Sequence, residues 1–176
     1  RTVMAHLGNG ASVCATTQHQ SRATTMGFSA LDGLMMGTRS GALDPGVLPY
    51  LMEQGWGHDQ IQKLLYKQSG LLGVSGESAD MRTLRASASE AARFAVDLFT
   101  HRVVREVGAL SACVGGLDVL AFTGGIGEHD AVLRQQVGDA LAYLGVHIDA
   151  ARNAKAAGDS VASIHPDNSA IEVWVI

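Results

Sequence analysis

The feature that most constrains the fold is an apolar segment, Asp118–Thr123, which runs directly into the glycine-rich sequence Gly124-Gly125-Ile126-Gly127. A continuous apolar run of this length is typical of a buried strand. The residues from about Asp130 to Leu144 are predicted to form the helix that follows. A strand, a glycine turn and a helix in this order make a βα unit, and this unit predicts an α/β fold.

Further strands are predicted near both ends of the chain. Thr2–Leu7 and Ala11–Thr17 are short apolar runs separated by Gly8-Asn9-Gly10. We expect a hairpin here, because Asn-Gly supplies the positive φ angles that a tight turn between strands needs. Two more strands are predicted at Ser160–His165 and Ile171–Ile176.

Three helices are predicted before the βα unit. Pro45–Gln54 and Asp59–Gln68 look like two short helices, since Pro45 can open a helix at its first turn. From Ser89 to Leu110, apolar residues recur at three- and four-residue spacing, which indicates a long amphipathic helix with Ser87 or Ser89 near its N-cap. Its apolar stripe must pack on the sheet.

Two segments have no clear periodicity. Ala23–Asp44 is rich in Gly, Met, Ser and Thr, and we interpret it as the end of a strand that runs into a functional loop. Ser69–Glu77 is rich in Gly and Ser, and it is also predicted to be a loop.

Composition narrows the class of protein. A hydrophobic fraction of 47% and a charged fraction of 17% over 176 residues are ordinary for a soluble globular chain, with one domain as the default. No apolar run of about 18 residues and no signal-peptide pattern occurs, so we expect a cytoplasmic protein with no membrane contact. A net charge of −4 without a basic run argues against nucleic-acid binding as its function.

The two cysteines and the two chain ends carry less information. Cys14 and Cys113 are far apart in sequence and form no Cys-x-x-Cys motif, so we expect buried free thiols rather than a disulfide or a zinc site. The chain starts at Arg1 and stops at Ile176 inside an apolar alternating segment. We therefore expect a fragment of a longer protein.

Three glycine-rich turns form the strongest functional signal, and they span His6–Gly10, Gly37–Gly41 and Thr123–Glu128. Glycines let a backbone approach a ligand closely, and the helix that starts near Asp130 would offer a positive dipole end to a phosphate. Taken singly, each turn could equally be a tight turn with no ligand.

Familiar nucleotide and hydrolase motifs do not fit. There is no G-x-x-x-x-G-K-[ST] sequence, and Asp130 stands where a dinucleotide fingerprint needs its third glycine. A serine-hydrolase elbow at Ser75 fails because Glu77 occupies the position of a required glycine.

Four strings together resemble the acetate kinase family, in the family's order and at about its spacing. They are HLGNGAS, TTMGFSALDGLMMGTRSGALDPG, SGLLGVSGESADMR and FTGGIGEHDAVLR, and they cover essentially the whole chain. The string MGTRSG is specific to this family and disfavours a butyrate or sugar kinase. The TGGIGE turn is a looser version of an adenosine motif that the wider actin-like ATPase superfamily shares.

The resemblance implies an α/β actin-like ATPase (ribonuclease H-like) domain, with a mixed sheet flanked by helices. Residues 1–176 would be the C-terminal nucleotide-binding domain, without the N-terminal domain and the final C-terminal segment. The family transfers the γ-phosphoryl group of ATP to acetate or propionate with Mg²⁺, yielding ADP and the acyl phosphate. It forms homodimers through this region.

The resemblance also implies roles for particular residues. Arg39 matches the arginine that stabilises the transition state. The positions that match ATP-binding segments are His6, Leu7, Gly8, Asn9, Gly10, Asp80, Met81, Arg82, Gly125, Ile126, Gly127, Glu128 and His129. No metal ligand is expected in this chain, and Glu128 with His129 is poor evidence for one because no third partner stands at ligand spacing.

The chemistry supports Arg39 independently. In phosphoryl transfer the charge sits on equatorial oxygens, and a planar guanidinium can hold two of them at once. Several alternatives remain open. The role of Arg39 could be purely structural, with its side chain bonded to backbone carbonyls of its own loop. His6 could be a core residue, and Asp80 and Arg82 could form a solvated surface pair.

The sequence departs from the family pattern at three positions. Ala23 and Ala42 stand where the family has Asp, which removes hydrogen bonds that would brace the loop, and His129 replaces an Asn that contacts adenosine. The acceptor pocket, the catalytic Asp and the metal-supporting residues have no counterparts here. We therefore expect the isolated chain to be inactive, and the alternative function is a catalytically silent nucleotide-binding or dimerisation module.

Overall fold

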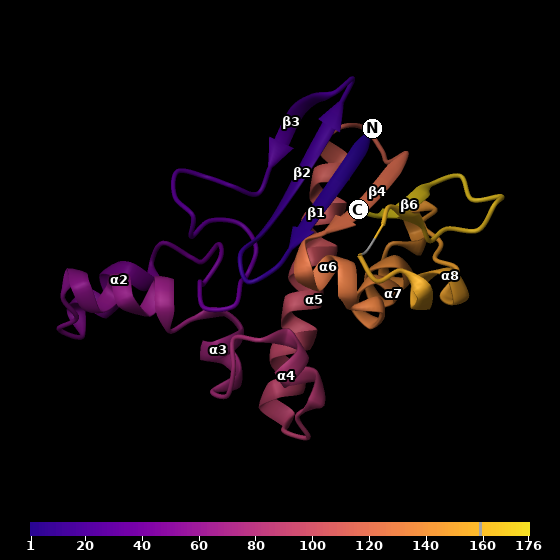
Figure 1. Ribbon diagram of the computed structural model, residues 1–176. Helices are drawn as coiled ribbons and strands as arrows, with labels where there is room; N and C mark the ends of the chain where they lie inside the picture. Colours follow the sequence, from indigo (N-terminus) through magenta and orange to yellow (C-terminus); the bar gives the residue numbers. More distant parts are fainter. Residues whose placement is uncertain (159) are drawn as a thin grey trace. The chain divides into compact units, whose positions relative to one another are not determined.

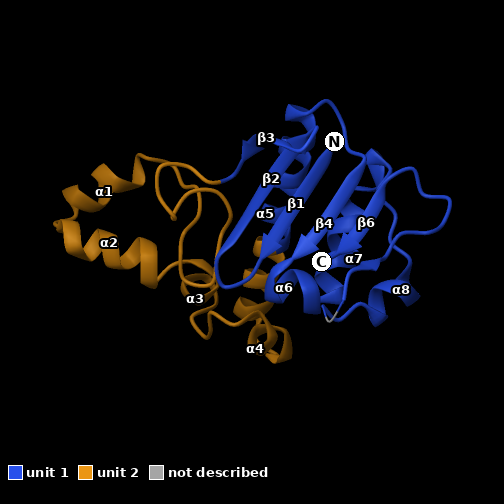
Figure 2. Ribbon diagram, turned by 45° about the horizontal axis from the view of Figure 1, so that its top comes forward, with its two compact units in different colours: residues 1–25, 100–176 blue, residues 26–99 orange. Residues whose placement is uncertain are grey.

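The computed structural model describes residues 1–158 and 160–176, which fold into two compact units. The first unit contains residues 1–25 and 100–176, and the second contains residues 26–99 (Figure 2). The long helix α5 (Glu90–Cys113) starts in the second unit and ends in the first.

The first unit is built on a six-stranded mixed sheet with the strand order β3-β2-β1-β4-β6-β5 (Figure 1). Strands β1 and β4 are parallel, as are β4 and β6, whereas the pairs β1–β2, β2–β3 and β5–β6 are antiparallel. The predicted mixed sheet is confirmed. The strands are β1 (Thr2–Leu7), β2 (Ala11–Thr17), β3 (Gln20–Thr24), β4 (Val119–Thr123), β5 (Ala162–Ser163) and β6 (Glu172–Val175).

The core of this unit lies on one face of the sheet. Along β1, Val3, Ala5 and Leu7 are fully buried, while Met4 and His6 between them are exposed. Strands β2, β4 and β6 contribute to the same buried face, with Val13, Phe122 and Val175 among the residues involved. Because side chains alternate along a strand, each strand places one set of apolar residues in the core and the other set on the opposite face.

Helices cover the buried face (Figure 2). They are the second half of α5, α6 (Gly124–His129), α7 (Ala131–Ala140) and α8 (Ala150–Lys155), with a short 3-10 turn at Ala142–Leu144. The predicted helix at about 130–144 is confirmed as α7 with the 3-10 turn that follows it, whereas the helix α6, in the glycine-rich sequence before it, was not predicted. The Asp130 carboxylate accepts the Leu133 N–H at 2.9 Å and so caps a new helix.

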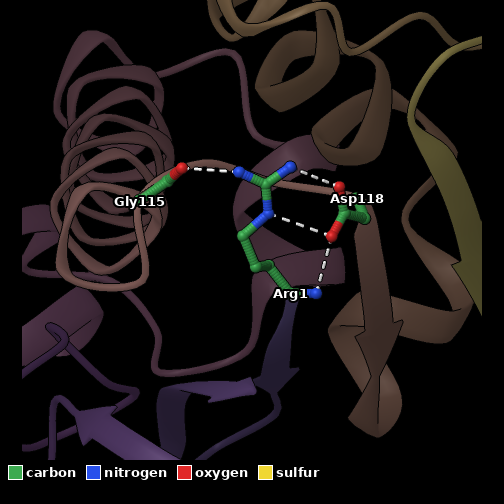
Figure 3. A network of polar contacts seen from close by, with 3 residues as sticks. All are labelled: Arg1, Gly115 and Asp118. Atoms are coloured by element: carbon green, nitrogen blue, oxygen red, sulfur yellow. Dashed lines mark hydrogen bonds and ion pairs between the residues drawn. The ribbon is translucent and has the colours of Figure 1, made fainter. Parts of the chain in front are cut away.

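An arginine clamp joins the starts of β1 and β4 (Figure 3). The Arg1 guanidinium donates to both carboxylate oxygens of Asp118, at 3.0 and 2.5 Å, and to the Gly115 carbonyl at 2.5 Å. The main-chain oxygen of Arg1 accepts the N–H groups of Asp118 and Val119. Hydrogen bonds from Arg1 hold the pKa of the Asp118 carboxyl well below its usual range.

The two hairpin turns of the sheet differ from the predicted geometry. The hairpin between β1 and β2 is confirmed, but neither Asn9 nor Gly10 has a positive φ. Positive φ occurs instead at Gln18 (52°) and His19 (61°), the two residues between β2 and β3. This two-residue connection needs left-handed backbone, which is uncommon for residues other than glycine.

The second unit is helical. Its helices are α1 (Val47–Glu53), α2 (His58–Lys67), α3 (Gly70–Ser75), α4 (Met81–Ala86) and the first half of α5. The two predicted short helices and the long helix are confirmed, and the Ser89 hydroxyl accepts the Ala92 N–H at 3.2 Å at the start of α5. The predicted loop at Ser69–Glu77 is wrong, because its centre forms α3. In the described residues, no helix is long and apolar enough to cross a membrane.

Candidate functional site

Two glycine turns of the first unit lie side by side. Strands β1 and β4 are parallel, with His6 opposite Thr123, so the turns that follow them leave the same edge of the sheet. Gly124 has a φ of +80°, and a Cβ at this position would stand 2.7 Å from the Leu7 carbonyl oxygen. Gly8 also faces the second turn, since its Cβ would lie 3.9 Å from the Gly125 nitrogen. The absence of side chains is what allows this close approach.

The glycines of the second turn have different surroundings. Gly127 is buried, and a Cβ there would meet Phe122 at 3.5 Å, so this residue packs on the sheet. Gly125 is exposed, and a Cβ there would have no neighbour within 4 Å among the described residues. The turn is therefore anchored at Gly124 and Gly127, and it leaves the main chain at Gly125 uncovered.

His6 lies on the exposed face of β1, which excludes the core-residue alternative for this side chain. In the register of the sheet, His6 is opposite Ser12 on β2 and opposite Thr123 on β4. The three polar side chains therefore form one row on the same face. Thr123 belongs to a glycine turn that the sequence had singled out, whereas the place of Ser12 beside His6 follows only from the strand register.

Glu128 and His129 fold back onto the same turn. The Glu128 carboxylate accepts the Gly124 N–H at 2.8 Å, and Nδ1 of His129 lies 3.1 Å from the Gly125 carbonyl oxygen. Both side chains thus contact the start of α6. Among residues 1–158 and 160–176, no three His, Cys, Asp or Glu side chains gather in a group that could hold a metal ion.

The second unit contains the loop that carries Arg39. This loop closes on itself, since the Ala42 N–H donates to the Gly33 carbonyl at 2.9 Å and the Met36 N–H donates to the Arg39 carbonyl at 3.2 Å. Gly41 has a φ of +71°, and a Cβ there would stand 2.6 Å from the Leu34 carbonyl oxygen. The ends of the loop meet only because Gly41 lacks a side chain.

The start of α3 holds the tip of the same loop. The N–H groups of Ser69, Leu71 and Leu72 donate to the carbonyls of Thr38, Met36 and Gly37 at 2.9 to 3.0 Å. These are amides that a helix start leaves without partners inside the helix. Gly70 between them has a φ of +64°, and its Cβ would stand 2.1 Å from the Met36 carbonyl oxygen.

The Arg39 side chain is half-buried and only weakly held. Its guanidinium donates to the Ala30 carbonyl at 3.3 Å and approaches the Met36 sulfur at 3.6 Å. No ion pair of the described residues includes Arg39. The loop is braced by main-chain bonds, so most donors of this guanidinium are left for another acceptor.

Asp80, Met81 and Arg82 form the start of α4. The Asp80 carboxylate accepts the Arg82 N–H at 3.2 Å and the Thr83 hydroxyl at 3.1 Å, and the first of these bonds is the main cause of its lowered pKa. Met81 is buried, whereas Arg82 is exposed and lies 3.5 Å from Asp80. The surface-pair alternative therefore describes a contact that exists, and the nucleotide role of these residues stays a prediction.

Comparison with known proteins identifies relatives along the whole chain. The family model of the acetokinase family matches residues 1–176. An acetate kinase from Rhodopseudomonas palustris (strain TIE-1) is 52% identical over 177 aligned residues, which are 100% of this chain and 44% of the relative. An acetate kinase from Rickettsia prowazekii (strain Madrid E) is 47% identical over an alignment that covers 100% of this chain and 45% of the relative.

Solved structures give the same picture. The crystal structure of Porphyromonas gingivalis acetate kinase matches with a TM-score of 0.95 and 38% identity, covering 100% of this chain and 45% of that protein. A propionate kinase from Francisella tularensis matches with a TM-score of 0.90 and 41% identity, covering 99% of this chain and 45% of that protein. The chain thus spans less than half the length of the relatives it matches.

Proposed function

This chain belongs to the acetokinase family, and we propose that it is the nucleotide-binding part of a short-chain carboxylate kinase. The whole protein would transfer the γ-phosphoryl group of ATP to acetate or propionate, giving ADP and the acyl phosphate. Relatives of both names match this chain, so the choice between the two acids stays open.

The observation that carries the proposal is the pair of glycine turns at one edge of the sheet. Ligands of open α/β sheets bind at the carboxyl ends of parallel strands, and β1 and β4 end here side by side. Gly124 brings the turns together, while the main chain at Gly125 is uncovered. An uncovered main chain of this kind can approach a nucleotide closely.

We assign the phosphates to the first turn and the adenosine to the second. His6, Gly8, Asn9 and Gly10 would face phosphate oxygens, since Asn9 and His6 are exposed and can donate hydrogen bonds. Residues 125–129 would support the base and ribose. Leu7 has a buried side chain, so only its main chain could contribute.

Arg39 would act on the transferring phosphoryl group. Its donors are largely unused within the second unit, and its loop does not need the side chain for support. A guanidinium with free donors matches the charge that spreads over equatorial oxygens. Asp80, Met81 and Arg82 are kept as an adenosine-side segment of the proposal.

The remaining parts of the proposal rest on the family. ATP-dependent transfer of this kind would use a divalent metal, which we take to be Mg²⁺, and the described residues contain no group of three or more His, Cys, Asp or Glu side chains that could hold a metal ion. We therefore assign no step through a metal to this chain. A homodimer through this region is also proposed, and light scattering at tens of micromolar would test it.

Titration of the 176-residue chain with ADP tests the nucleotide function. We expect the wild-type chain to bind ADP. We expect Gly125→Val to raise the Kd for ADP by about tenfold or more, because the new side chain takes space that the ligand would use. Gly57→Val is the matched control. Gly57 also lacks a positive φ, and among the described residues the one atom within 4 Å of its Cβ would be the Gln60 side-chain oxygen, at an ordinary contact distance of 3.7 Å.

Two results would count against the proposal. One is a wild-type chain that does not bind ADP, and the other is a Gly125→Val variant that binds as tightly as Gly57→Val. A separate assay with ATP, Mg²⁺ and acetate addresses catalysis. We expect no turnover from this chain alone, because it spans less than half the length of its relatives.

A further inference from the structure

Arg134 on α7 is the largest fully buried side chain among the described residues, with no exposed surface. A buried charge is normally paired with an opposite charge. None of the ion pairs of the described residues includes Arg134. Burial lowers the pKa of its guanidinium, and the negative charge of Asp130 offsets part of this effect.

The guanidinium is satisfied by neutral oxygens. Nε donates to the side-chain oxygen of Asn153 at 2.7 Å, and one terminal nitrogen donates to the carbonyls of Gly127 and Glu128 at 2.8 and 2.6 Å. The other terminal nitrogen donates to the carbonyls of Asn153 and Ala156 at 2.9 and 3.0 Å. All five N–H groups of an arginine are therefore used.

These acceptors come from two separate segments. Gly127 and Glu128 are at the end of α6, where carbonyls lack partners inside the helix. Asn153 lies on α8, and Ala156 is the first residue after the end of this helix. The Asn153 amide also donates to the Ala131 carbonyl at 2.8 Å, so it connects α8 to the start of α7.

Gly158 extends the same contact. Its φ is +79°, and a Cβ there would stand 2.6 Å from a Glu128 carboxylate oxygen and 3.2 Å from the His129 ring. The chain after α8 therefore packs against the last residues of α6. Arg134 holds the carbonyls of both segments from the buried side.

The contacts continue from Arg134 to the first glycine turn. Arg134 holds the Glu128 carbonyl, and the Glu128 carboxylate accepts the Gly124 N–H at 2.8 Å. Gly124 in turn packs against the Leu7 carbonyl. The position of the second turn relative to the first thus depends on a side chain ten residues further along the sequence.

We propose that Arg134 is a positioning residue, which fixes the Gly124–His129 turn in the conformation that receives the nucleotide. The inference rests on the proposed nucleotide-binding function. Arg134 itself is buried beneath the turn and acts through Gly127 and Glu128. Lysine cannot replace it, because an ammonium has three donors and no planar fork, so at least two of the five acceptors would lose their partner.

The test compares Arg134→Lys with Val137→Ala in the 176-residue chain. Val137 is also fully buried on α7 and makes no hydrogen bond to the turn through its side chain, so its variant controls for general loss of stability. Both are measured well below their thermal midpoints. We expect Arg134→Lys to speed amide hydrogen exchange at residues 124–129 and to raise the Kd for ADP, each by about tenfold.

Asn153→Ala provides a graded comparison. It removes the partner of Nε and the bond to Ala131 but leaves the bonds to Gly127 and Glu128, so we expect a smaller change in both measurements. Val137→Ala should leave residues 124–129 protected and the Kd unchanged.

Equal effects of Arg134→Lys and Val137→Ala on exchange and on the Kd would overturn the proposal, because they would reflect stability alone. The proposal would also be overturned if Arg134→Lys had the same amide exchange at residues 124–129 and the same Kd for ADP as the wild type. If the wild-type chain does not bind ADP, the proposed function fails. Exchange at residues 124–129 then decides by itself whether Arg134 positions the turn.

Discussion

The glycine turn of the first unit and the arginine loop of the second unit are held in place by different means. The turn at Gly124–His129 is fixed by the buried Arg134. The five donors of this side chain all bond to the main chain of the turn or to the neighbouring segment at Asn153 and Ala156. The loop at 33–42 is fixed by its own main chain and by the start of α3. The guanidinium of its arginine, Arg39, has a single main-chain acceptor among residues 1–158 and 160–176.

The difference separates two uses of the same side chain. An arginine whose donors are all used inside the protein can support a site but cannot bind a ligand. An arginine whose loop is stable without it can direct its donors to a substrate. This comparison predicts that replacing the two arginines has effects of different kinds, one on structure and affinity and the other on the rate of the chemical step.

The largest effect is expected for Arg39→Lys in the enzyme at the full length of its relatives. An arginine on a transferring phosphoryl group can be worth on the order of 10³-fold in rate, so kcat should fall by about that factor while ADP affinity changes by less than about twofold. Steady-state kinetics and calorimetry measure the two quantities. A kcat within about threefold of wild type, together with a lower thermal midpoint, would show that Arg39 only braces its loop.

The next effect concerns the support of the arginine loop. Gly70→Ala should lower the free energy of unfolding by about 3 kcal/mol or more, because its Cβ would stand 2.1 Å from the Met36 carbonyl oxygen. Gly76→Ala, at the other end of α3, is the matched control. Its φ of +66° is almost the same, but no atom of the described residues lies within 4 Å of the Cβ, so only the left-handed strain of about 1 to 2 kcal/mol remains.

Chemical denaturation of the two glycine variants measures the difference. Since both residues need the same backbone conformation, the difference between the two losses reports the contact between α3 and the arginine loop. Equal losses would contradict the idea that α3 supports the loop at Gly70.

The smallest effect is expected for the ion pair of a third arginine, Arg1, because its partner Asp118 changes protonation with pH and so makes stability depend on pH. Because the folded pKa of Asp118 is lowered, its carboxylate stabilises the fold above the ordinary Asp pKa of about 4, and this contribution is lost as the pH falls below that value. The acceptors of Arg134 are carbonyl and amide oxygens, which do not titrate. Asp118→Asn should therefore flatten the acid limb of the stability profile.

Thermal unfolding of the wild type and of Asp118→Asn between about pH 3 and pH 7 measures this effect. The two proteins should differ most near neutral pH, and the difference should begin to shrink below about pH 4, because the contribution is lost only as the pH falls from the ordinary Asp pKa toward the much lower folded pKa. A constant difference over the whole range would mean that the Arg1–Asp118 contact is not a source of pH dependence. The pair is exposed, so we expect a modest difference at its largest.

Much of the fold could be predicted from local patterns. The βα unit, the hairpin from Thr2 to Thr17 and the helix from Glu90 follow from apolar periodicity and from residues such as Ser89, which act within a few positions of themselves. The helix α3 was missed because its sequence, rich in glycine and serine, has weak helix propensity. It is stabilised at its first turn by carbonyls of residues 36–38, more than thirty residues earlier in the chain.

The left-handed positions show the same limit. Asn9-Gly10 has the composition of a tight turn, yet the positive φ angles occur at Gln18 and His19. The register between β2 and β3 leaves only these two residues to reverse the chain, and strand pairing outweighs their intrinsic preference.

The sequence by itself determined the α/β class, the glycine turns and the resemblance that names Arg39, because these depend on short strings and on spacing along the chain. Only the tertiary structure decided what each turn contacts. Arg134 looks like any polar residue of a helix, and its five acceptors lie 6 to 22 positions away. They meet its guanidinium only when α6, α7 and α8 pack together, since hydrogen-bond geometry is set by distances in space rather than by separation along the chain.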